Sequence, residues 1–504
     1  MTRSQKFMYN TISSAIYQVI VMVVGFITPR VMLITYGSEI NGLVSSITQF
    51  ISYFNLVEAG LSGAAIYALY KPLADNDHKA INGVVSAAKK FYYISGYIFV
   101  LLVIGLAFVY PILVQTEYLS PLFVGTLVLI MGVSGTLEFF TLAKYRAIIS
   151  ADQKSYVISF ASIVHMILNT IIVVSLAKLK VNIVLLELIA LLSIFLRSLI
   201  LMIYTHRKYS YIDYKAEPNE KALDKRWDAL YLQVLNVVQK GAPTVLATIF
   251  TNLKSVSVYS IFNMVVSGIS SLLDIFMSGL SASFGDIIAR KDIKTLQKAY
   301  REFEFTYYGL ITVVYTTALV MIMSFVKIYT NGITDVSYNQ PLIGFLFVIN
   351  GFLYNIKTPQ GMLVISAGLY KETKVQSTIQ AVIVIISGVI LTPFTGLAGV
   401  LIALCLSNVY RDIDLILFIP KHVTHLPVKE TIFRLIYTFI AIGLIIVPFI
   451  FININIQNIV QWCLYAFVIF TYSAVVICII YFIFDKQQFK SVLLRIKSML
   501  KRRK

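Results

Sequence analysis

Long apolar stretches separated by short polar breaks run along almost the whole chain. Fourteen of them are long enough to cross a bilayer, since a membrane-spanning helix needs about 20 predominantly apolar residues. They cover residues 10–34, 41–69, 91–114, 121–143, 156–177, 183–205, 229–250, 256–288, 304–326, 341–366, 374–393, 396–419, 431–452 and 460–484. The pattern predicts an all-α polytopic membrane protein with about 14 transmembrane helices.

Three polar stretches are amphipathic. Residues 75–90 and 290–304 predict surface helices that lead into the third and ninth spans. In the tail 485–504, Phe489, Val492 and Ile496 fall at helical spacing beside many Lys and Arg residues. This tail predicts a helix lying on the anionic inner leaflet, with a simple stop-transfer tail as the alternative.

Composition and charge placement agree with a membrane protein. The chain is 58% apolar, with a mean hydropathy of +0.81, against roughly 45–50% apolar residues in soluble domains. Its net charge of +18 could indicate nucleic-acid binding, so the placement of the charges decides. With a cytoplasmic N-terminus, the outside loops hold only four of the 42 Lys and Arg residues: Lys178, Lys180, Lys254 and Lys327. This asymmetry follows the positive-inside rule and predicts that both termini are cytoplasmic and that no nucleic acid is bound.

An internal repeat divides the chain. Several short patterns recur about 215 residues later: Gln18-Val19 as Gln233-Val234, Asp77 and Lys79 as Asp292 and Lys294, Tyr92-Tyr93 as Tyr307-Tyr308, and Arg197 as Arg411. The repeat predicts two parallel six-helix bundles, 1–205 and 229–419, joined by a cytoplasmic linker, 206–228. Residues 430–484 form an additional helix pair, and 485–504 form a basic cytoplasmic tail. Parallel repeats of this kind are related by an axis along the membrane normal and surround a central cavity.

Basic residues inside the spans are the first candidates for function, because a charge at the bilayer centre costs about 2.5–3.5 kcal/mol. Arg30 follows Pro29 in the first span, and Lys240 precedes Gly241 and Pro243, which can open the seventh span. Arg197 and Arg411 occupy equivalent depths in the sixth and twelfth spans. Together they predict a cationic cavity for a phosphate or pyrophosphate group. The alternatives are an ion pair of Arg411 with Asp412 or Asp414, snorkelling of Arg197, and, for Arg434, an interface anchor.

Acidic residues form a second set of candidates. Glu58, Glu138 and Asp274 lie inside spans, and Glu187 lies nearer the outer surface. An intramembrane carboxylate either binds a coupling H⁺ or Na⁺ or neutralises a neighbouring base. His165, in the fifth span, is interpreted as a hydrogen-bonded core residue.

Catalytic and cofactor motifs are missing from the sequence. It contains no phosphate-binding loop, no His-Glu-x-x-His and no Gly-x-Ser-x-Gly. Cys405, Cys463 and Cys478 lie in apolar stretches without metal-ligand spacing. We therefore expect that the protein is not an enzyme and that it has no metal site and no cofactor apart from a coupling H⁺ or Na⁺.

The segments PRVMLITYGSEINGL (29–43) and LVEAGLSGAAIYALYKPLA (56–74), together with the twelve-plus-two plan of spans, resemble a polysaccharide flippase of the multidrug/oligosaccharidyl-lipid/polysaccharide exporter superfamily. The resemblance extends over essentially the whole chain. It implies a bacterial plasma-membrane transporter whose central cavity opens alternately to each side. The implied substrate is an undecaprenyl-pyrophosphate-linked sugar unit that is flipped to the outer leaflet, with polysaccharide-assembly proteins as partners. Arg30 is the residue that best matches the cationic cavity residues of the family.

Three other functions compete with this interpretation. A drug/cation antiporter of the same superfamily would favour an acidic cavity. A lipid II flippase would account for the additional helix pair, which in that branch helps to form a groove for the lipid tail. A membrane polymerase or glycosyltransferase would need a sizeable extramembrane loop, and the longest outside loop, 327–340, is short.

Overall fold

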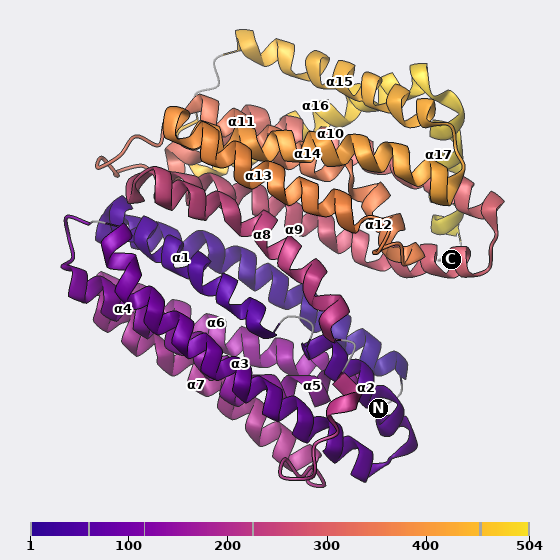
Figure 1. The fold of residues 1–504 in the computed structure, drawn as a ribbon. Coiled ribbons are helices and arrows are strands. Elements are labelled where there is room, and N and C mark those ends of the chain that lie inside the picture. Colours follow the sequence, from indigo (N-terminus) through magenta and orange to yellow (C-terminus); the bar gives the residue numbers. More distant parts are fainter. Residues whose placement is uncertain (1–2, 59–60, 115, 224–225, 453–455, 502–504) are drawn as a thin grey trace. The chain divides into compact units, whose positions relative to one another are not determined.

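The protein is helical throughout the part that the structure describes. The computed structural model describes residues 3–58, 61–114, 116–223, 226–452 and 456–501, which contain helices and connecting loops but no strand (Figure 1). Eleven helical segments among these residues are long and apolar enough to cross a membrane, and the first, Met8–Asp75, contains two of the predicted spans. The expectation of an all-α multi-pass membrane protein is confirmed, with the number of spans approximate.

The chain divides into two compact units. Unit 1 comprises Met1–Ser260 with Gly332–Val336, and unit 2 comprises Ile261–Asn331 with Ser337–Lys504. This division places the helix Arg226–Phe250 in unit 1, whereas the sequence repeat assigns it to the second half. The boundaries drawn from the repeat remain a prediction.

Unit 1 contains the first eight helices and the start of the ninth. They are α1 (Arg3–Phe54), α2 (Leu61–Asp75), α3 (His78–Leu113), α4 (Pro121–Leu137), α5 (Ala143–Ala151), α6 (Ser155–Lys178), α7 (Ile183–Lys208), α8 (Arg226–Phe250) and α9 (Leu253–Ala289). Short turns η1 (Asn55–Glu58), η2 (Glu138–Leu142) and η3 (Glu220–Leu223) interrupt them.

The first predicted loop shrinks to a kink at Gly37. Gly37 has φ 80° and ψ 176°, a backbone conformation that favours glycine, and it divides α1 into two arms. The second arm begins with Ser38, whose backbone N and Oγ each donate a hydrogen bond of 2.7 Å to the Asp335 carboxylate. The predicted second span is interrupted, because α1 ends at Phe54 and α2 begins at Leu61.

The core of unit 1 consists of two apolar clusters. One joins α1, α3, α4 and the start of α7 around Phe99, Leu127 and Leu186. The other joins α2, α3 and α5 with the second half of α7 around Tyr92, Ile148 and Leu201. The break between α4 and α5 falls between these clusters, which leaves room for polar side chains at that level.

An ion cluster holds the start of α1 against the turn between α5 and α6. The carboxylate of Asp152 receives hydrogen bonds from Lys6 (2.7 Å), Lys154 and Tyr209 (2.8 Å), and the Lys154 ion pair measures 2.5 Å. Burial disfavours the charge on Asp152, but the hydrogen bonds from Lys154, Lys6 and Tyr209 outweigh it and hold its pKa below the ordinary value.

Unit 2 contains the rest of α9 and eight further helices. They are α10 (Ile293–Tyr329), α11 (Pro341–Ile356), α12 (Thr358–Ala367), α13 (Lys374–Thr395), α14 (Leu397–Ile419), α15 (Val428–Phe451), α16 (Ile459–Phe484) and α17 (Lys486–Lys501), with a turn η4 (Pro420–Thr424). The predicted surface helices 75–90 and 290–304 are not separate, because α3 and α10 run on without a break from His78 and Ile293 into their membrane spans.

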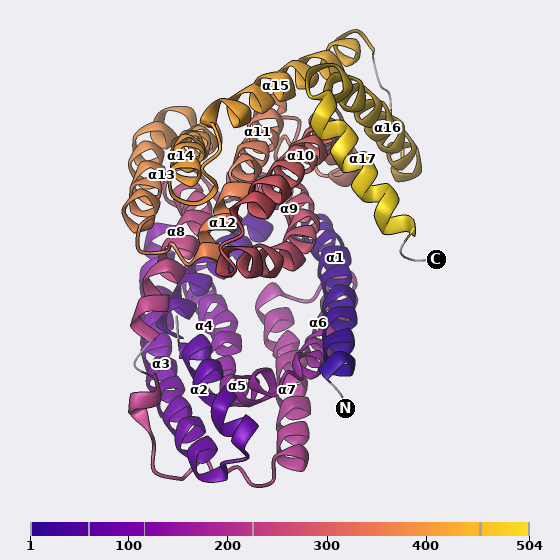
Figure 2. The same ribbon diagram turned by 90° about the vertical axis from the view of Figure 1, so that its right-hand side faces the viewer.

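The additional helix pair α15–α16 packs on α10, and α17 packs beside it (Figures 1 and 2). Arg434 of α15 forms a buried ion pair with Glu304 of α10, so the expectation that Arg434 is an interface anchor is wrong. The predicted tail helix is present over Lys486–Lys501, and Arg495 forms a 2.5 Å ion pair with Glu302 of α10. Both contacts tie the C-terminal helices to unit 2.

Backbone details recur at the spacing of the sequence repeat. Asp77 and Asp292 cap the N-termini of α3 and α10, with bonds of 3.0 and 3.1 Å to the backbone N of Ala80 and Thr295. Left-handed residues recur as Asn76 and Lys291, as Gln153 and Gly368, and as Lys180 and Gly396. Since such conformations are uncommon, their recurrence at offsets of 215 or 216 residues supports the internal repeat.

Candidate functional site

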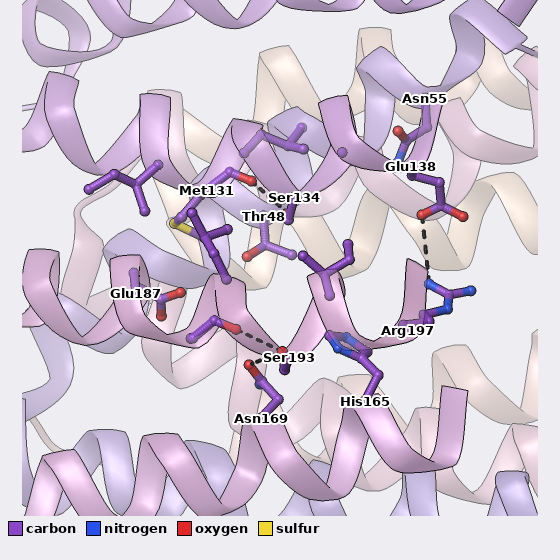
Figure 3. Close-up of a pocket in the computed structure, with 16 residues that line it drawn as sticks. Thr48, Asn55, Met131, Ser134, Glu138, His165, Asn169, Glu187, Ser193 and Arg197 are labelled. Atoms are coloured by element: carbon purple, nitrogen blue, oxygen red, sulfur yellow. Dashed lines mark hydrogen bonds and ion pairs between the residues drawn. The ribbon is translucent and has the colours of Figure 1, made fainter. Parts of the chain in front are cut away.

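Unit 1 encloses a polar cavity of about 340 Å³ between α1, α4, α6 and α7 (Figure 3). It lies at the level where α4 gives way to α5. Its polar lining residues are Thr48, Asn55, Ser134, Glu138, His165, Asn169, Glu187, Ser193 and Arg197. Polar and charged groups at membrane depth are costly unless they face such a cavity, which makes this cavity the candidate site.

A π-helical turn places Glu138 at the cavity wall. The turn spans Glu138–Leu142, and the backbone N of Ala143 bonds to the Glu138 carbonyl. In a regular helix, Arg146 would be rotated by about 80° from Glu138, since eight residues at about 100° each exceed two full turns. The extra residue of a π turn removes about one step of that rotation and brings both side chains to nearly the same face. Single π turns of this kind are frequent at functional sites.

Two guanidinium groups share the Glu138 carboxylate. Arg146 forms an ion pair with Oε1, and Nη1 of Arg197 lies 4.0 Å from Oε2. The Arg197 side chain is only 14% exposed, and its Nε is buried without a hydrogen-bond partner among the described residues. Arg197 therefore lines the cavity with a buried Nε donor that has no partner among the described residues.

Glu58 adds a second carboxylate to this group. It lies in η1, interacts electrostatically with Arg146 and Glu138, and has Oε2 buried without a partner in the described part of the chain. Two bases and two acids thus surround one end of the cavity. Such a group can exchange partners when an ion enters, because Arg197 and Glu58 each keep a buried atom without a hydrogen-bond partner in the described part of the chain.

The remaining walls are polar but mostly neutral. Ser193 Oγ donates to the Ala190 carbonyl at 2.7 Å and lies 3.3 Å from Asn169 Oδ1. His165 has a buried Nδ1 with no partner among the residues described, while a hydrogen bond with the backbone of Ser193 agrees with its interpretation as a hydrogen-bonded residue. Glu187 lies at the opposite end of the cavity from Glu138 (Figure 3), ten residues or about 15 Å along α7 from Arg197.

The structure thus brings Arg197 and Glu138 together, with Glu58 close by. Sequence reasoning missed Arg146, which lies beyond the end of the predicted span 121–143. No pattern in the sequence predicts the π turn. In a regular helix the spacing of Glu138 and Arg146 would place their side chains on different faces, so the sequence gives no reason to pair them.

Arg30 and Lys240 also belong to unit 1 but do not line this cavity. Arg30 is half-buried in the first arm of α1, and Lys240 is exposed on α8. The predicted opening of the helix at Gly241 and Pro243 is not seen, since α8 continues from Arg226 to Phe250. Gly241 instead allows close packing, because a Cβ there would lie 2.4 Å from Nε2 of Gln49.

The other predicted site residues lie in unit 2. Arg411 forms a 2.5 Å ion pair with Asp414, as the alternative interpretation of Arg411 expected. Asp274 is exposed on α9. A joint role for these residues with those of unit 1 in a central cavity remains a prediction.

Comparison of the fold finds several membrane transporters. A multidrug resistance MATE family transporter in an inward-facing conformation matches with a TM-score of 0.70 and 13% identity over 84% of this chain and 99% of its own. The lipid II flippase MurJ, in an inward closed conformation, matches with a TM-score of 0.69 and 14% identity over 94% of this chain and 98% of its own.

A further match is a MOP superfamily transporter from Pyrococcus furiosus Vc1, which is described as having a binding pocket of reversed polarity. Its TM-score is 0.53, with 12% identity over 80% of this chain and 94% of its own. No protein-family model and no curated relative matches the sequence. On these likenesses, the chain has the fold that MATE family transporters share with the lipid II flippase MurJ.

Proposed function

We propose that this protein is a transporter that flips undecaprenyl-pyrophosphate-linked oligosaccharide units from the inner to the outer leaflet of a bacterial plasma membrane. The units would serve the assembly of a capsule, exopolysaccharide or O-antigen-type polysaccharide. Transport would proceed by alternating access, with both termini in the cytoplasm. The fold and the polar cavity of unit 1 support this proposal.

One observation carries the choice of an anionic substrate. Arg197 faces the cavity with a buried, unpartnered Nε and a long 4.0 Å contact to Glu138. A phosphate or pyrophosphate accepts two parallel hydrogen bonds from a guanidinium, and such charge-assisted bonds are about twice as strong as neutral ones. Entry of the anion would shift Arg197 from the shared carboxylate to the ligand, while Arg146 keeps Glu138 neutralised.

The size of the cavity fits part of the substrate. At about 340 Å³ it lies at the lower end of the roughly 300–1,000 Å³ range of ligand pockets. This volume suits a phosphate-bearing headgroup with a neighbouring sugar. The polyprenyl tail would remain in the lipid, where its apolar surface costs nothing to solvate.

The test measures binding of a short undecaprenyl-pyrophosphate oligosaccharide to the purified protein by native mass spectrometry. Arg197→Ala should weaken binding about 10- to 100-fold, because hydrogen bonds to a charged group contribute about 1.5–3 kcal/mol. Arg197→Lys should weaken binding less than Arg197→Ala, since lysine keeps the positive charge but lacks the two parallel donors of the guanidinium group. Arg290→Ala is the matched control, because the Arg290 side chain is 73% exposed and its ion pair with Asp286 lies outside the cavity.

Equal binding by wild type and Arg197→Ala would refute the assignment of the headgroup to this cavity. The Arg30→Ala/Lys240→Ala double variant then tests the predicted central site. Binding of a cationic dye that Glu58→Gln abolishes, without binding of the lipid, would favour the drug/cation antiporter, which would use the acids of the same group.

A specific observation favours lipid II as a second candidate substrate. The MurJ match covers 94% of this chain and the MATE match 84%. The larger coverage is expected if the pair α15–α16 has a counterpart in MurJ. Comparing lipid II with the oligosaccharide lipid in the same binding assay distinguishes the two substrates.

A further inference from the structure

Unit 2 contains a second polar site at the position that corresponds to the cavity of unit 1. α11 ends at Ile356 and α12 starts at Thr358, so this span breaks at Lys357. The equivalent span of unit 1 breaks at the π turn after α4. In unit 2 α14 lies beside the break, as α7 lies beside the break in unit 1.

The charges of the two sites are reversed. In unit 1 the break carries the acid Glu138, and the neighbouring helix carries Arg197. In unit 2 the break carries Lys357, and the neighbouring helix carries Arg411 and Asp412, which follow Arg197 by 214 and 215 residues. Arg411 is neutralised by Asp414, which leaves Asp412 as the unpaired charge on α14. A site that is basic on α7 and acidic on α14 is suited to ions of opposite charge.

Asp412 is a buried acid without a partner. Its residue is only 5% exposed, and both carboxylate oxygens are buried with no hydrogen-bond partner among the described residues. An ionised carboxylate is strongly disfavoured in such surroundings, so the group either takes up a proton or binds a cation.

Lys357 is the base best placed to respond to Asp412. It interacts electrostatically with Asp412 but lies beyond ion-pair distance, since no N–O contact within 4.0 Å joins the two described side chains. Its Nζ instead donates to Oδ1 of Asn408 and lies 4.8 Å from the centroid of the Tyr354 ring. Because Asn408 is one helical turn from Asp412 on α14, a rotamer change of the Lys357 side chain would exchange one partner for the other.

The other charged groups around Asp412 are engaged elsewhere. On α14, Arg411 is paired with Asp414 at 2.5 Å. On α10, the Tyr308 hydroxyl accepts a hydrogen bond of 3.0 Å from Gln360, and Glu304 is paired with Arg434 of α15.

Among the described residues, the remaining elements packed on α14 give no hydrogen bond to the Asp412 carboxylate. α13 carries one ionisable residue, Lys374, at its first position, and faces α14 with the neutral Gln380, whose carbonyl accepts from Ser407. In η4, Lys421 and His422 follow Asp412 by nine and ten residues, more than two helical turns away.

The geometry points to Asp412 as a proton-binding site of unit 2, protonated while Lys357 is held by Asn408 and ionised when Lys357 turns toward it. The proton would come from water and return to it. A metal cation fits poorly, because it needs several oxygen ligands and Lys357 would repel it. Within the described part of the chain, no group of three or more His, Cys, Asp or Glu residues could hold a metal ion.

Infrared difference titration of the protein in lipid nanodiscs tests proton binding directly. Asp412→Asn should remove one component, the Asp412 band, from the C=O absorption of protonated carboxyl groups that wild type shows. Asp286→Asn, the exposed acid control, should leave this band in place. Lys357→Met should keep this band to higher pH, because the base that stabilises the ionised form is gone. Absence of the band at every pH at which the protein is folded would overturn the proposal. So would loss of the band on adding Na⁺ at constant pH, which would identify a cation site.

The role of this proton in transport rests on the proposed function and has its own measurement. In proteoliposomes, Asp412→Asn should bind the oligosaccharide lipid like wild type. The increase in flipping rate that a pH gradient causes should be at least tenfold smaller in this variant than in wild type. Unchanged flipping by Asp412→Asn under the gradient would refute the coupling. If wild type flips no lipid while the infrared band is present, the proposed function fails and the proton site stands.

Discussion

The buried pair of Arg434 and Glu304 gives a prediction with a calculable size. Glu304 is fully buried and, besides the ion pair, accepts hydrogen bonds from Tyr300 (2.8 Å), Gln360 (3.0 Å) and Thr431 (2.9 Å). Replacing Arg434 with Met keeps most of the side-chain volume but removes the positive charge. The carboxylate would then remain buried among neutral donors.

Breaking a buried ion pair on one side costs about 3–5 kcal/mol. Unit 2 has roughly the size for which each 1 kcal/mol lowers Tm by about 2–4 °C. The Arg434→Met variant should therefore melt on the order of 10 °C below wild type. Adding Glu304→Gln should recover part of this loss, because it removes the unpaired charge, and the two changes should be strongly non-additive.

A tryptophan provides the assay. Nε1 of Trp462 in α16 donates a hydrogen bond of 3.1 Å to the carbonyl of Met321 in α10, so its fluorescence reports whether the additional pair is docked. The second tryptophan, Trp227, is replaced with Phe in every variant. Thermal unfolding in detergent is then followed by the emission of Trp462.

Two results would refute this reasoning. One is an Arg434→Met variant whose Tm is no lower than that of the control Arg290→Met. The Arg290 side chain is 73% exposed in the native protein, so its loss should cost little stability. The other is a double variant whose loss equals the sum of the single losses. Either would mean that Arg434 does not stabilise the buried carboxylate of Glu304.

Two further predictions concern unit 1. The Asp152 carboxylate has a pKa below its ordinary value in the folded protein, so it contributes stability above the unfolded pKa of about 3.9 that is lost as the pH falls through the folded value. Asp152→Asn should therefore flatten the fall of Tm below about pH 4, and an equal fall in Asp152→Asn and in the exposed control Asp286→Asn would contradict this. A Cβ at Gly42 would lie 1.8 Å from the carbonyl oxygen of Leu253, so Gly42→Ala should lower Tm by several degrees through overpacking. At Gly25, where a Cβ would meet nothing within 4 Å, alanine should leave Tm unchanged or raise it; similar melting of the two alanine variants would refute the packing argument.

The sequence alone determined the class of the protein and much of its helix plan. Span 91–114 ends one residue beyond α3, and spans 121–143 and 460–484 lie within the broken pair α4–α5 and within α16. Hydropathy over about 20 residues predicts such helices because the bilayer requires every backbone group in a span to be bonded within that segment. The repeat was also visible, since it is a property of the order of residues.

The partners of the charged side chains were decided by the tertiary structure. The π turn that faces Arg146 toward Glu138, the buried pair of Arg434 with Glu304, and the unpartnered Asp412 leave no signal in the local pattern. Each depends on which helices pack together and on one-residue changes in helical phase. The cost of a buried charge is set by the groups that surround it in space, so the sequence could indicate which residues carry such charges but not which of them are satisfied.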